Sequence, residues 1–383
     1  MRRGGRLIMA NKNDNKEYQM LASSVREFAQ KELAPHLGDN DHWPLSDFFV
    51  AALDKAFALD FFHVMLPEEL NGWGGKIKPL CLILKNIAEV DASLSAILLT
   101  NAVAQEILHQ ADAGDLLRSI AGESQKPGEF FTAYPLLTHP DEDDMLLQAF
   151  PQNGHFVLTG QAEYVALGPM AKRALLPAKT ATGGGFDFFL VDITQAGIKM
   201  GEPILSMGLH ACPAADLMLD GAEGRLIGKP GEGPHYFNRA MTRMLPAAAA
   251  VSCGLIQGSL KEALQYSRKR KQGGRRILDW SELRLILADM ALSAKTAEIL
   301  LAQALHAVDV GDAKWAEDAY TAAIYILEAA CEVTSNGIQA LGGYGYTKHH
   351  FQERRFRDAQ HLSSVFGSAI PRRLNFVRQC LNW

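Results

Sequence analysis

The chain has 383 residues, of which 48 % are hydrophobic and 21 % are charged. This composition is typical of a folded globular protein, and the length predicts two or three packed units. The formal net charge of -5 gives no electrostatic reason to bind nucleic acid or an anionic membrane surface. No apolar run approaches the ~20 residues that a membrane-spanning helix requires.

The amino-terminal segment and the cysteines indicate a protein of a reducing compartment. The first six residues are basic, but a polar segment follows them where a signal peptide would have an apolar core. We therefore expect a cytoplasmic protein that starts at Met1 or at Met9. The five cysteines are scattered and never form a Cys-x-x-Cys pair, which favours free thiols over a disulfide framework or a metal site.

Apolar residues recur at helical spacing through the first third of the chain. One face of an expected helix over residues 16–37 carries Leu21, Val25, Phe28 and Leu33, and Pro35 is a helix breaker near its end. Further helices are expected at 45–58, 79–90 and 93–109, with a loop rich in glycine at 66–75. This pattern predicts an N-terminal α-helical domain over residues 16–127.

The pattern changes twice in the rest of the chain. Short alternating apolar runs separated by glycine and proline follow residue 128, and they predict a central antiparallel β barrel or sandwich over 128–235. Long helices are then expected at 237–270, 281–310, 313–337 and 363–381, which predicts a C-terminal four-helix bundle over 236–383. The predicted fold is therefore mainly α with a β insert.

The strongest local motif is the run Gln339–Tyr346, with the sequence QALGGYGY. Its three glycines end a helix and allow another group to approach the backbone closely. Exposed N–H groups in such a turn can bind a phosphate. A plain glycine cap between two helices is the competing interpretation of this run.

Three other segments accompany this motif: Arg354–Ala359 (RRFRDA), Tyr266–Gly274 (YSRKRKQGG) and Leu66–Glu69 (LPEE). Together, in order and spacing, they resemble the acyl-CoA dehydrogenase family from about Met20 to Leu381. The resemblance implies an oxidoreductase of fatty acid metabolism that uses FAD to oxidise the Cα–Cβ bond of an acyl-CoA. It also implies an oligomer with FAD across a subunit interface, and electron-transfer flavoprotein as partner of an active enzyme.

The resemblance assigns most of the residues that would bind the ADP half of FAD. Arg270 matches the family's pyrophosphate-binding arginine, and guanidinium groups bind phosphate through paired hydrogen bonds. The matching glutamine, glycine pair and hydroxyl residue are Gln339, Gly342, Gly343 and Ser368. The family's aromatic residue three positions after the arginine is Gly273 here, so an adenine-stacking surface is lost. A solvated arginine within the basic run 268–271 is the alternative for Arg270.

The positions that the resemblance assigns to the flavin ring and to catalysis are more altered. The aromatic residue that packs on the flavin corresponds to Tyr164, but Ala166 stands where a threonine hydroxyl should bond the ring. The usual glutamate base corresponds to Phe366, and the alternative base position on the long helix falls at Met244. No catalytic residue is identified, because neither side chain accepts a proton in this chemistry.

Several functions remain open from the sequence. The chain could be a non-catalytic subunit in a heteromer with an active homologue, an active dehydrogenase in a homo-oligomer with an unrecognised base, or an interaction protein without enzymatic activity. A di-iron helical protein is a further alternative, because Glu106 with His109 and Asp358 with His361 have ligand spacing on a helix.

Overall fold

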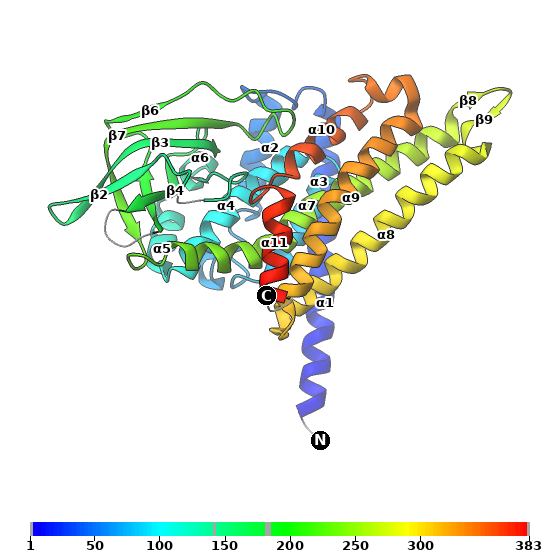
Figure 1. Ribbon diagram of the computed structural model, residues 1–383. Coiled ribbons are helices and arrows are strands. Elements are labelled where there is room, and N and C mark those ends of the chain that lie inside the picture. Colours follow the sequence, from blue (N-terminus) through cyan, green and yellow to red (C-terminus); the bar gives the residue numbers. More distant parts are fainter. Residues whose placement is uncertain (1–2, 141–142, 181–184, 381–383) are drawn as a thin grey trace.

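The structure is a computed structural model that describes residues 3–140, 143–180 and 185–380. Its elements follow the expected order of helices, strands and helices (Figure 1). The amino-terminal elements are α1 (Arg3–Phe28), a π-helical turn (Ala29–Leu33), a 3-10 turn (Ala34–His36), α2 (Asp47–Ala58), a 3-10 turn (Glu68–Leu70), α3 (Ile77–Ala88), α4 (Ala92–Gln110), α5 (Gly114–Glu123) and α6 (Pro127–Phe130).

Side-chain caps fix where two of these helices begin. The hydroxyl of Ser46 accepts a hydrogen bond from the Phe49 N–H at 3.2 Å, at the start of α2. The carboxylate of Asp91 does the same for the Leu94 N–H at 3.1 Å, at the start of α4. Both bonds satisfy N–H groups that a helix start leaves without partners. Helix α4 is buried all round from Ala92 to Leu108, as its mostly apolar sequence requires.

The central strands form a closed sheet. They are β1 (Thr132–Ala133), β2 (Gln148–Gln152), β3 (His155–Ala166), β4 (Arg173–Thr180), β5 (Phe186–Asp192), β6 (Ile198–Met200) and β7 (Ala214–Ile227). The strand order is β1-β4-β2-β3-β7-β5, β6 pairs with β7, and a further pairing of β4 with β5 closes the ring. The pairings are antiparallel except for the short ones of β4 with β1 and with β2, which are parallel.

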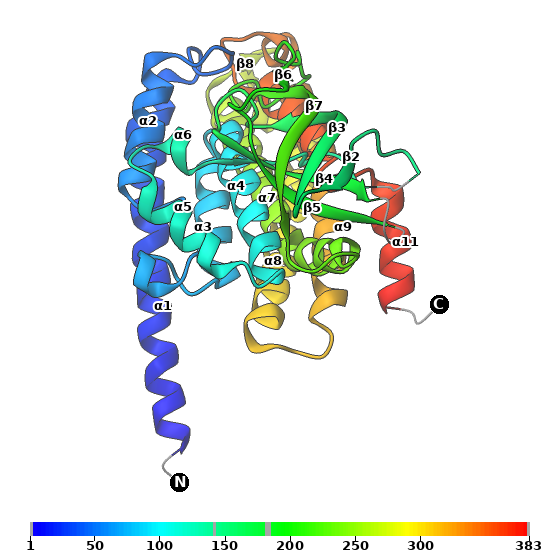
Figure 2. The same cartoon turned by 90° about the vertical axis from the view of Figure 1, so that its left-hand side faces the viewer.

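The carboxyl-terminal elements are mostly long helices. They are α7 (Gly233–Lys269), a hairpin of β8 (Lys271–Gln272) and β9 (Arg275–Arg276), a 3-10 turn (Ile277–Asp279), α8 (Ser281–Val310), α9 (Trp315–Leu341), a 3-10 turn (Gly342–Tyr346), α10 (Gln352–Leu362) and α11 (Ala369–Cys380). Figures 1 and 2 show the sheet on one side of the helices, and the hairpin at the far end of α7 and α8. Among the described residues, no helix combines the length and apolar character needed to cross a membrane.

The last expected helix differs in extent from the observed one. The sequence predicts a helix over 363–381, whereas α11 begins at Ala369 and a turn precedes it. The buried guanidinium of Arg372 donates hydrogen bonds to the carbonyls of Ser363, Val365 and Gly367 at 2.6–2.8 Å. These carbonyls are thereby satisfied without helical hydrogen bonds, which explains why the turn is stable.

Helix α10 joins the three regions of the molecule through buried charges. The guanidinium of Arg354 donates to Asp91 Oδ2 at 2.7 Å and to the Leu37 carbonyl at 2.9 Å, both among the amino-terminal helices. The carboxylate of Asp358 accepts a hydrogen bond from the Leu209 N–H at 2.7 Å, just before β7. The motif RRFRDA, which carries the resemblance in this segment, thus has a structural role in packing.

Candidate functional site

The glycine turn after α9 exposes its backbone. Gly342 has φ +60° and ψ −137°, a conformation that residues with a side chain rarely adopt. A Cβ atom added at Gly342 or at Gly343 would meet nothing within 4 Å. The two glycines therefore border open space, and a ligand can approach the chain there at close range.

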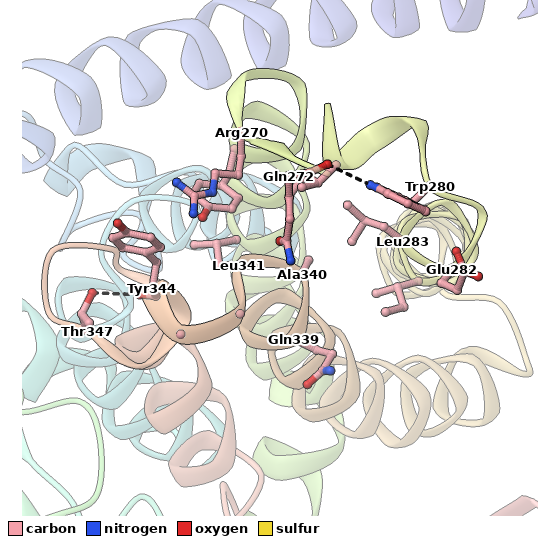
Figure 3. Close-up of a pocket in the computed structure, with 15 residues that line it drawn as sticks. Arg270, Gln272, Trp280, Glu282, Leu283, Gln339, Ala340, Leu341, Tyr344 and Thr347 are labelled. Atoms are coloured by element: carbon pink, nitrogen blue, oxygen red, sulfur yellow. Dashed lines mark hydrogen bonds between the residues drawn. The ribbon is translucent and has the colours of Figure 1, made fainter. Parts of the chain in front are cut away.

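This open space is part of a cavity of about 720 Å³, which we call the glycine-turn cavity. Its lining residues come from α7, the β8–β9 hairpin, the turn before α8, α8 itself, and the end of α9 with the turn that follows it. They are Tyr266, Arg270, Gln272, Ile277, Trp280, Glu282, Leu283, Ile286, Gln339, Ala340, Leu341, Gly342, Gly343, Tyr344 and Thr347 (Figure 3). Four residues that the sequence predicts for the ADP half of FAD, namely Arg270, Gln339, Gly342 and Gly343, thus line one cavity.

The chemistry of this cavity fits a nucleotide diphosphate. Its volume lies within the ~300–1,000 Å³ that is usual for small-molecule sites. The Arg270 guanidinium lies 5.4 Å from the centre of the Tyr344 ring, and this contact holds the cation at the edge of the glycine turn. A guanidinium beside open backbone is a suitable partner for phosphate oxygens.

Two other predicted residues lie elsewhere. Ser368 is exposed between Gly367 and the start of α11, and it is not part of the glycine-turn cavity. Tyr164, on β3, lines a separate cavity of about 630 Å³, which we call the Tyr164 cavity. Its lining also includes Leu137, Thr138, Glu163, Ile204, Met207, Asp216, Gln360, His361 and Ser364.

Hydrogen bonds fix the ring of Tyr164 in this second cavity. Its hydroxyl lies 2.5 Å from Ser206 Oγ and 3.1 Å from His361 Nε2. Its backbone has φ +53°, and its N–H donates to Asp216 Oδ1 at 2.9 Å. Burial, with repulsion from His210, lowers the pKa of His361 to about 4, so the imidazole is neutral near pH 7.

Ala166, the position where the resemblance expects a threonine, is not among the residues that line this cavity. Ala166 is buried at the end of β3 and exchanges backbone hydrogen bonds of 3.0 Å with Tyr134. Its methyl group offers no hydrogen bond to a flavin ring. The Tyr164 cavity therefore fits a flavin less well than the glycine-turn cavity fits a diphosphate.

Both positions where the resemblance expects a base are apolar and buried. Phe366 is 4 % exposed and lies in the hydrophobic core, while its N–H donates to the Leu136 carbonyl at 2.9 Å. Met244 lies on α7 with no exposed surface. Neither a phenyl ring nor a thioether takes up a proton near neutral pH.

The two carboxylates considered for a di-iron site are paired with arginines. The carboxylate of Glu106 accepts a hydrogen bond from Arg243 at 2.7 Å, and Asp358 lies 3.7 Å from Arg354. Within the described ranges, no group of three or more His, Cys, Asp or Glu side chains is arranged to hold a metal ion. The spacing that motivated this alternative is present, but the carboxylates of Glu106 and Asp358 have arginine side chains as neighbours in place of further metal ligands.

Comparisons with known families agree with the observed order of elements. The model of the acyl-CoA dehydrogenase N-terminal domain matches residues 15–113, and the model of the acyl-CoA dehydrogenase C-terminal domain matches residues 231–377. Together they cover more than half of the chain. The chain belongs to the acyl-CoA dehydrogenase family. The family assignment supports FAD as the cofactor.

Individual members of the acyl-CoA dehydrogenase family match this chain along nearly its whole length. The caffeyl-CoA reductase-Etf complex subunit CarC of Acetobacterium woodii is 29 % identical, with 93 % of this chain and 96 % of that protein covered. The cyclohex-1-ene-1-carbonyl-CoA dehydrogenase of Syntrophus aciditrophicus is 25 % identical, with 94 % and 92 % covered. The relatives thus include both a reductase and a dehydrogenase of CoA thioesters.

Solved structures show the same fold. One solved structure, reported in a study of the electron transferring flavoprotein of Acidaminococcus fermentans, contains a chain with a TM-score of 0.86 and 27 % identity to this one. The match covers 96 % of this chain and 98 % of that chain. A glutaryl-coenzyme A dehydrogenase in complex with glutaryl-CoA has a TM-score of 0.84 at 26 % identity, with 96 % and 95 % covered. The predicted fold, mainly α with a β insert, is confirmed.

Sequence reasoning missed several residues of the two cavities. Trp280 and Tyr344 contribute aromatic rings to the glycine-turn cavity, and His361 contributes an imidazole to the Tyr164 cavity. Tyr344 stands inside the glycine motif itself, so its sequence position was a usable signal. Trp280 reaches its cavity through the 3-10 turn that precedes α8, and His361 through the packing of α10, and the sequence pattern specifies neither.

Proposed function

We propose that this chain is a flavoprotein subunit of the acyl-CoA dehydrogenase type that binds the ADP half of FAD but does not itself remove the substrate proton. The observation that carries the proposal is a contrast between two parts of the molecule. Arg270, Gln339 and the glycine pair line one open cavity, whereas buried Phe366 stands at the usual base position. Four residues that the resemblance assigns to the nucleotide line the cavity, whereas the position that it assigns to the base is apolar.

The chemistry of the family explains why this contrast matters. FAD supplies the acceptor for a hydride from Cβ of the acyl-CoA, and a carboxylate base must take the proton from Cα. Arg270 would bind the pyrophosphate, and the open space beside Gly342 and Gly343 would let its oxygens approach the backbone closely. Phe366 offers no atom for the proton, so the chain needs another source of the base.

We infer that a homologous subunit with the missing glutamate supplies that base, and that electron-transfer flavoprotein exchanges electrons with the assembly. The relative from Acetobacterium woodii, which is named as a subunit of a caffeyl-CoA reductase-Etf complex, supports this kind of partnership. The acyl group of the substrate is left open, because the relatives act on different CoA thioesters.

The chain purified alone tests the catalytic part of the proposal. Its flavin absorbance should not bleach with a panel of straight-chain, cyclic and aryl-substituted acyl-CoA thioesters, although dithionite should bleach any bound flavin. F366E should bleach with at least one thioester of the same panel, because it restores a carboxylate at the base position. Full FAD occupancy with bleaching of the unaltered chain by an acyl-CoA would contradict the proposal.

The nucleotide-binding part of the proposal is tested at Arg270. R270Q should weaken FAD binding by roughly 10- to 100-fold, because hydrogen bonds to charged groups contribute about 1.5–3 kcal/mol. The matched control is R268Q, which alters an exposed arginine on the same helix turn outside the cavity. If the two variants bind FAD with equal affinity in equilibrium dialysis, Arg270 does not contribute to FAD binding.

An active dehydrogenase with an unrecognised base is the second candidate. Glu163, an exposed carboxylate, lines the Tyr164 cavity, and neutral His361 lies in the same wall. Asp216 is a poorer base, because it already accepts hydrogen bonds from Gln161 at 3.1 Å and from the Tyr164 N–H at 2.9 Å. If the unaltered chain bleaches with an acyl-CoA, E163Q and H361N decide which group takes the proton.

A further inference from the structure

The loop between β6 and β7, residues 201–213, forms part of the wall of the Tyr164 cavity. Its residues Ile204 and Met207 line that cavity, and Ser206 Oγ lies 2.5 Å from the Tyr164 hydroxyl. Leu205, in the same stretch, is 100 % exposed, so nothing covers the loop on its outer side there. The contacts on its inner side therefore decide whether the loop stays in place.

Helix α10 holds the middle of this loop. The Leu209 N–H donates to Asp358 Oδ1 at 2.7 Å, and Arg357 donates to the Met207 carbonyl at 3.3 Å. Gly208 lies directly against the helix, because an added Cβ atom would be 2.5 Å from the Arg357 carbonyl oxygen. These contacts fix residues 207–209, and the preceding residues depend on other partners.

The imidazole of His210 supplies such a partner and joins the loop to the amino-terminal part of the chain. Its Nε2 atom lies 3.0 Å from the Ser206 carbonyl oxygen, and its Nδ1 atom lies 3.3 Å from the Asp41 carbonyl oxygen. Carbonyl oxygens only accept hydrogen bonds, whereas a neutral imidazole has a single N–H group. The protonated ring is therefore the form that satisfies both carbonyls at once.

The carboxylate of Asp41 favours this protonated form. Its Oδ1 atom lies 3.1 Å from His210 Nδ1, at ion-pair distance. The contact with Asp41 raises the pKa of His210 above its usual range, against the opposing effects of burial and of the Arg357 cation. Stability that comes from such a raised pKa is present at low pH and is lost as the pH rises through it.

The charged and titratable groups of α10 near His210 largely balance one another. Arg357 Nη1 lies 3.4 Å from both ring nitrogens, and this cation is paired with Asp41 at 2.6 Å and with Glu353 at 2.7 Å. Arg354 lies 3.7 Å from Asp358, and His361 is neutral near pH 7. The proton on His210 is thus the charge in this cluster that changes near neutral pH.

We propose that His210 is a pH-dependent latch, whose imidazolium holds the β6–β7 loop against the amino-terminal segment and whose deprotonation releases the Ser206 stretch from the wall of the Tyr164 cavity. The latched loop binds one more proton than the released loop, so alkaline pH opens it. This inference goes beyond the proposed function, because it concerns the second cavity and requires no bound nucleotide.

Hydrogen–deuterium exchange of the full chain from about pH 6 to about pH 9 tests the latch. The N–H groups of Ser206 and Cys212 donate to the carbonyls of Ile204 and Leu209 within the loop, so the exchange of residues 201–213, relative to the intrinsic chemical rate, reports its opening. Protection of this segment in the unaltered chain should fall by roughly 10- to 100-fold as the pH rises, because hydrogen bonds to a charged group are lost.

Two glutamine variants separate the latch from a general effect of pH. H210Q cannot gain or lose a proton at this position, so its loop should have low protection that does not change with pH. The matched control is H155Q, which alters an exposed histidine at the start of β3 and should behave as the unaltered chain does.

NMR of the chain with labelled histidine follows the imidazole itself. The His210 resonance, identified by its absence in H210Q, should titrate with a pKa above the ~6.5 of an ordinary histidine and over the pH range in which loop protection falls. A His210 pKa at or below that value, loop protection that is independent of pH in the unaltered chain, or the same pH dependence in H210Q would overturn the proposal.

Discussion

At the scale of single residues, Phe366, at the position that the resemblance assigns to the base, has an unusual backbone conformation. Its φ of +59° lies in the left-handed region, which costs about 1–3 kcal/mol for a residue with a bulky side chain. The hydrogen bond to the Leu136 carbonyl and the three carbonyls bound by Arg372 hold the turn in this conformation. The turn is therefore maintained by its surroundings and not by the residue at 366.

His361 gives a prediction for the pH dependence of stability. Its pKa is about 4 in the folded chain, mainly because of burial, and about 6.5 for an ordinary histidine. Between these values the unfolded chain binds a proton that the folded chain does not. Stability present above pH 6.5 is therefore lost as the pH falls toward 4. We expect the unfolding free energy of H361N, measured with urea, to fall less between pH 7 and pH 4.5 than that of the unaltered chain.

The control for this prediction is Y164F, which removes the hydroxyl 3.1 Å from His361 but leaves the imidazole buried. Because burial is the largest cause of the low pKa, Y164F should keep the pH dependence of the unaltered chain. A parallel pH dependence in H361N and the unaltered chain would show that His361 does not contribute in this way.

At the scale of elements, small residues on α7 set the distance between helices. A Cβ atom added at Gly254 would lie 2.4 Å from the Lys85 carbonyl on α3, and one at Gly258 would lie 2.4 Å from the Glu89 carbonyl just after α3. The backbones of α7 and α3 therefore touch at these glycines. Since α7 also carries Arg270 at its end, this packing positions the cavity relative to the amino-terminal helices.

Alanine substitutions at two helical glycines should have opposite effects. G254A should lower the free energy of unfolding by roughly 1–3 kcal/mol, because the added methyl group overpacks the contact with α3. G122A on α5 should raise it by about 0.5–1 kcal/mol, because the methyl group meets nothing within 4 Å and alanine favours helix. Thermal unfolding measures both, and a stabilised G254A would contradict the close packing described above.

Elements with strong periodicity could be predicted from the sequence, whereas contacts between them could not. The apolar faces of α7, α8 and α9 and the alternating strands gave the fold in outline, since both patterns are local. Helix α10 has few apolar residues and many charged ones, so its pattern did not predict a helix. Arg270 and Gln339 were found through a motif. Trp280 enters the same cavity only because the β8–β9 hairpin, which lies between Arg270 and Trp280 in the sequence, turns the chain back.

At the scale of the whole molecule, the buried cluster around Arg354 connects parts that are far apart in the sequence. Arg354 is 3 % exposed and binds Asp91, while Arg357 donates to Asp41 Oδ2 at 2.6 Å. A buried ion pair adds little net stability by itself, but removal of one partner leaves an uncompensated charge. The packing of α10 against the amino-terminal helices therefore depends strongly on each charged residue of the cluster.

R354M should lower the free energy of unfolding by roughly 3–5 kcal/mol, because Asp91 loses its buried cationic partner. R118M is the control, since Arg118 and Asp115 form an exposed pair on one helix and such pairs contribute about 1 kcal/mol or less. Urea unfolding of the two variants provides the comparison. A loss at Arg354 no larger than that at Arg118 would show that the cluster tolerates an unpaired carboxylate.

The same cluster has a consequence for folding during synthesis on the ribosome. The bonds of Arg354 to Leu37 and to Asp91 span 317 and 263 residues of sequence. Asp41 and Asp91 thus emerge long before the cations that neutralise them, and burial of an unpaired carboxylate is costly. We therefore expect the amino-terminal helices to complete their final packing only after α10 has been synthesised. Release of the carboxyl-terminal part from the ribosome should then allow the native core to close.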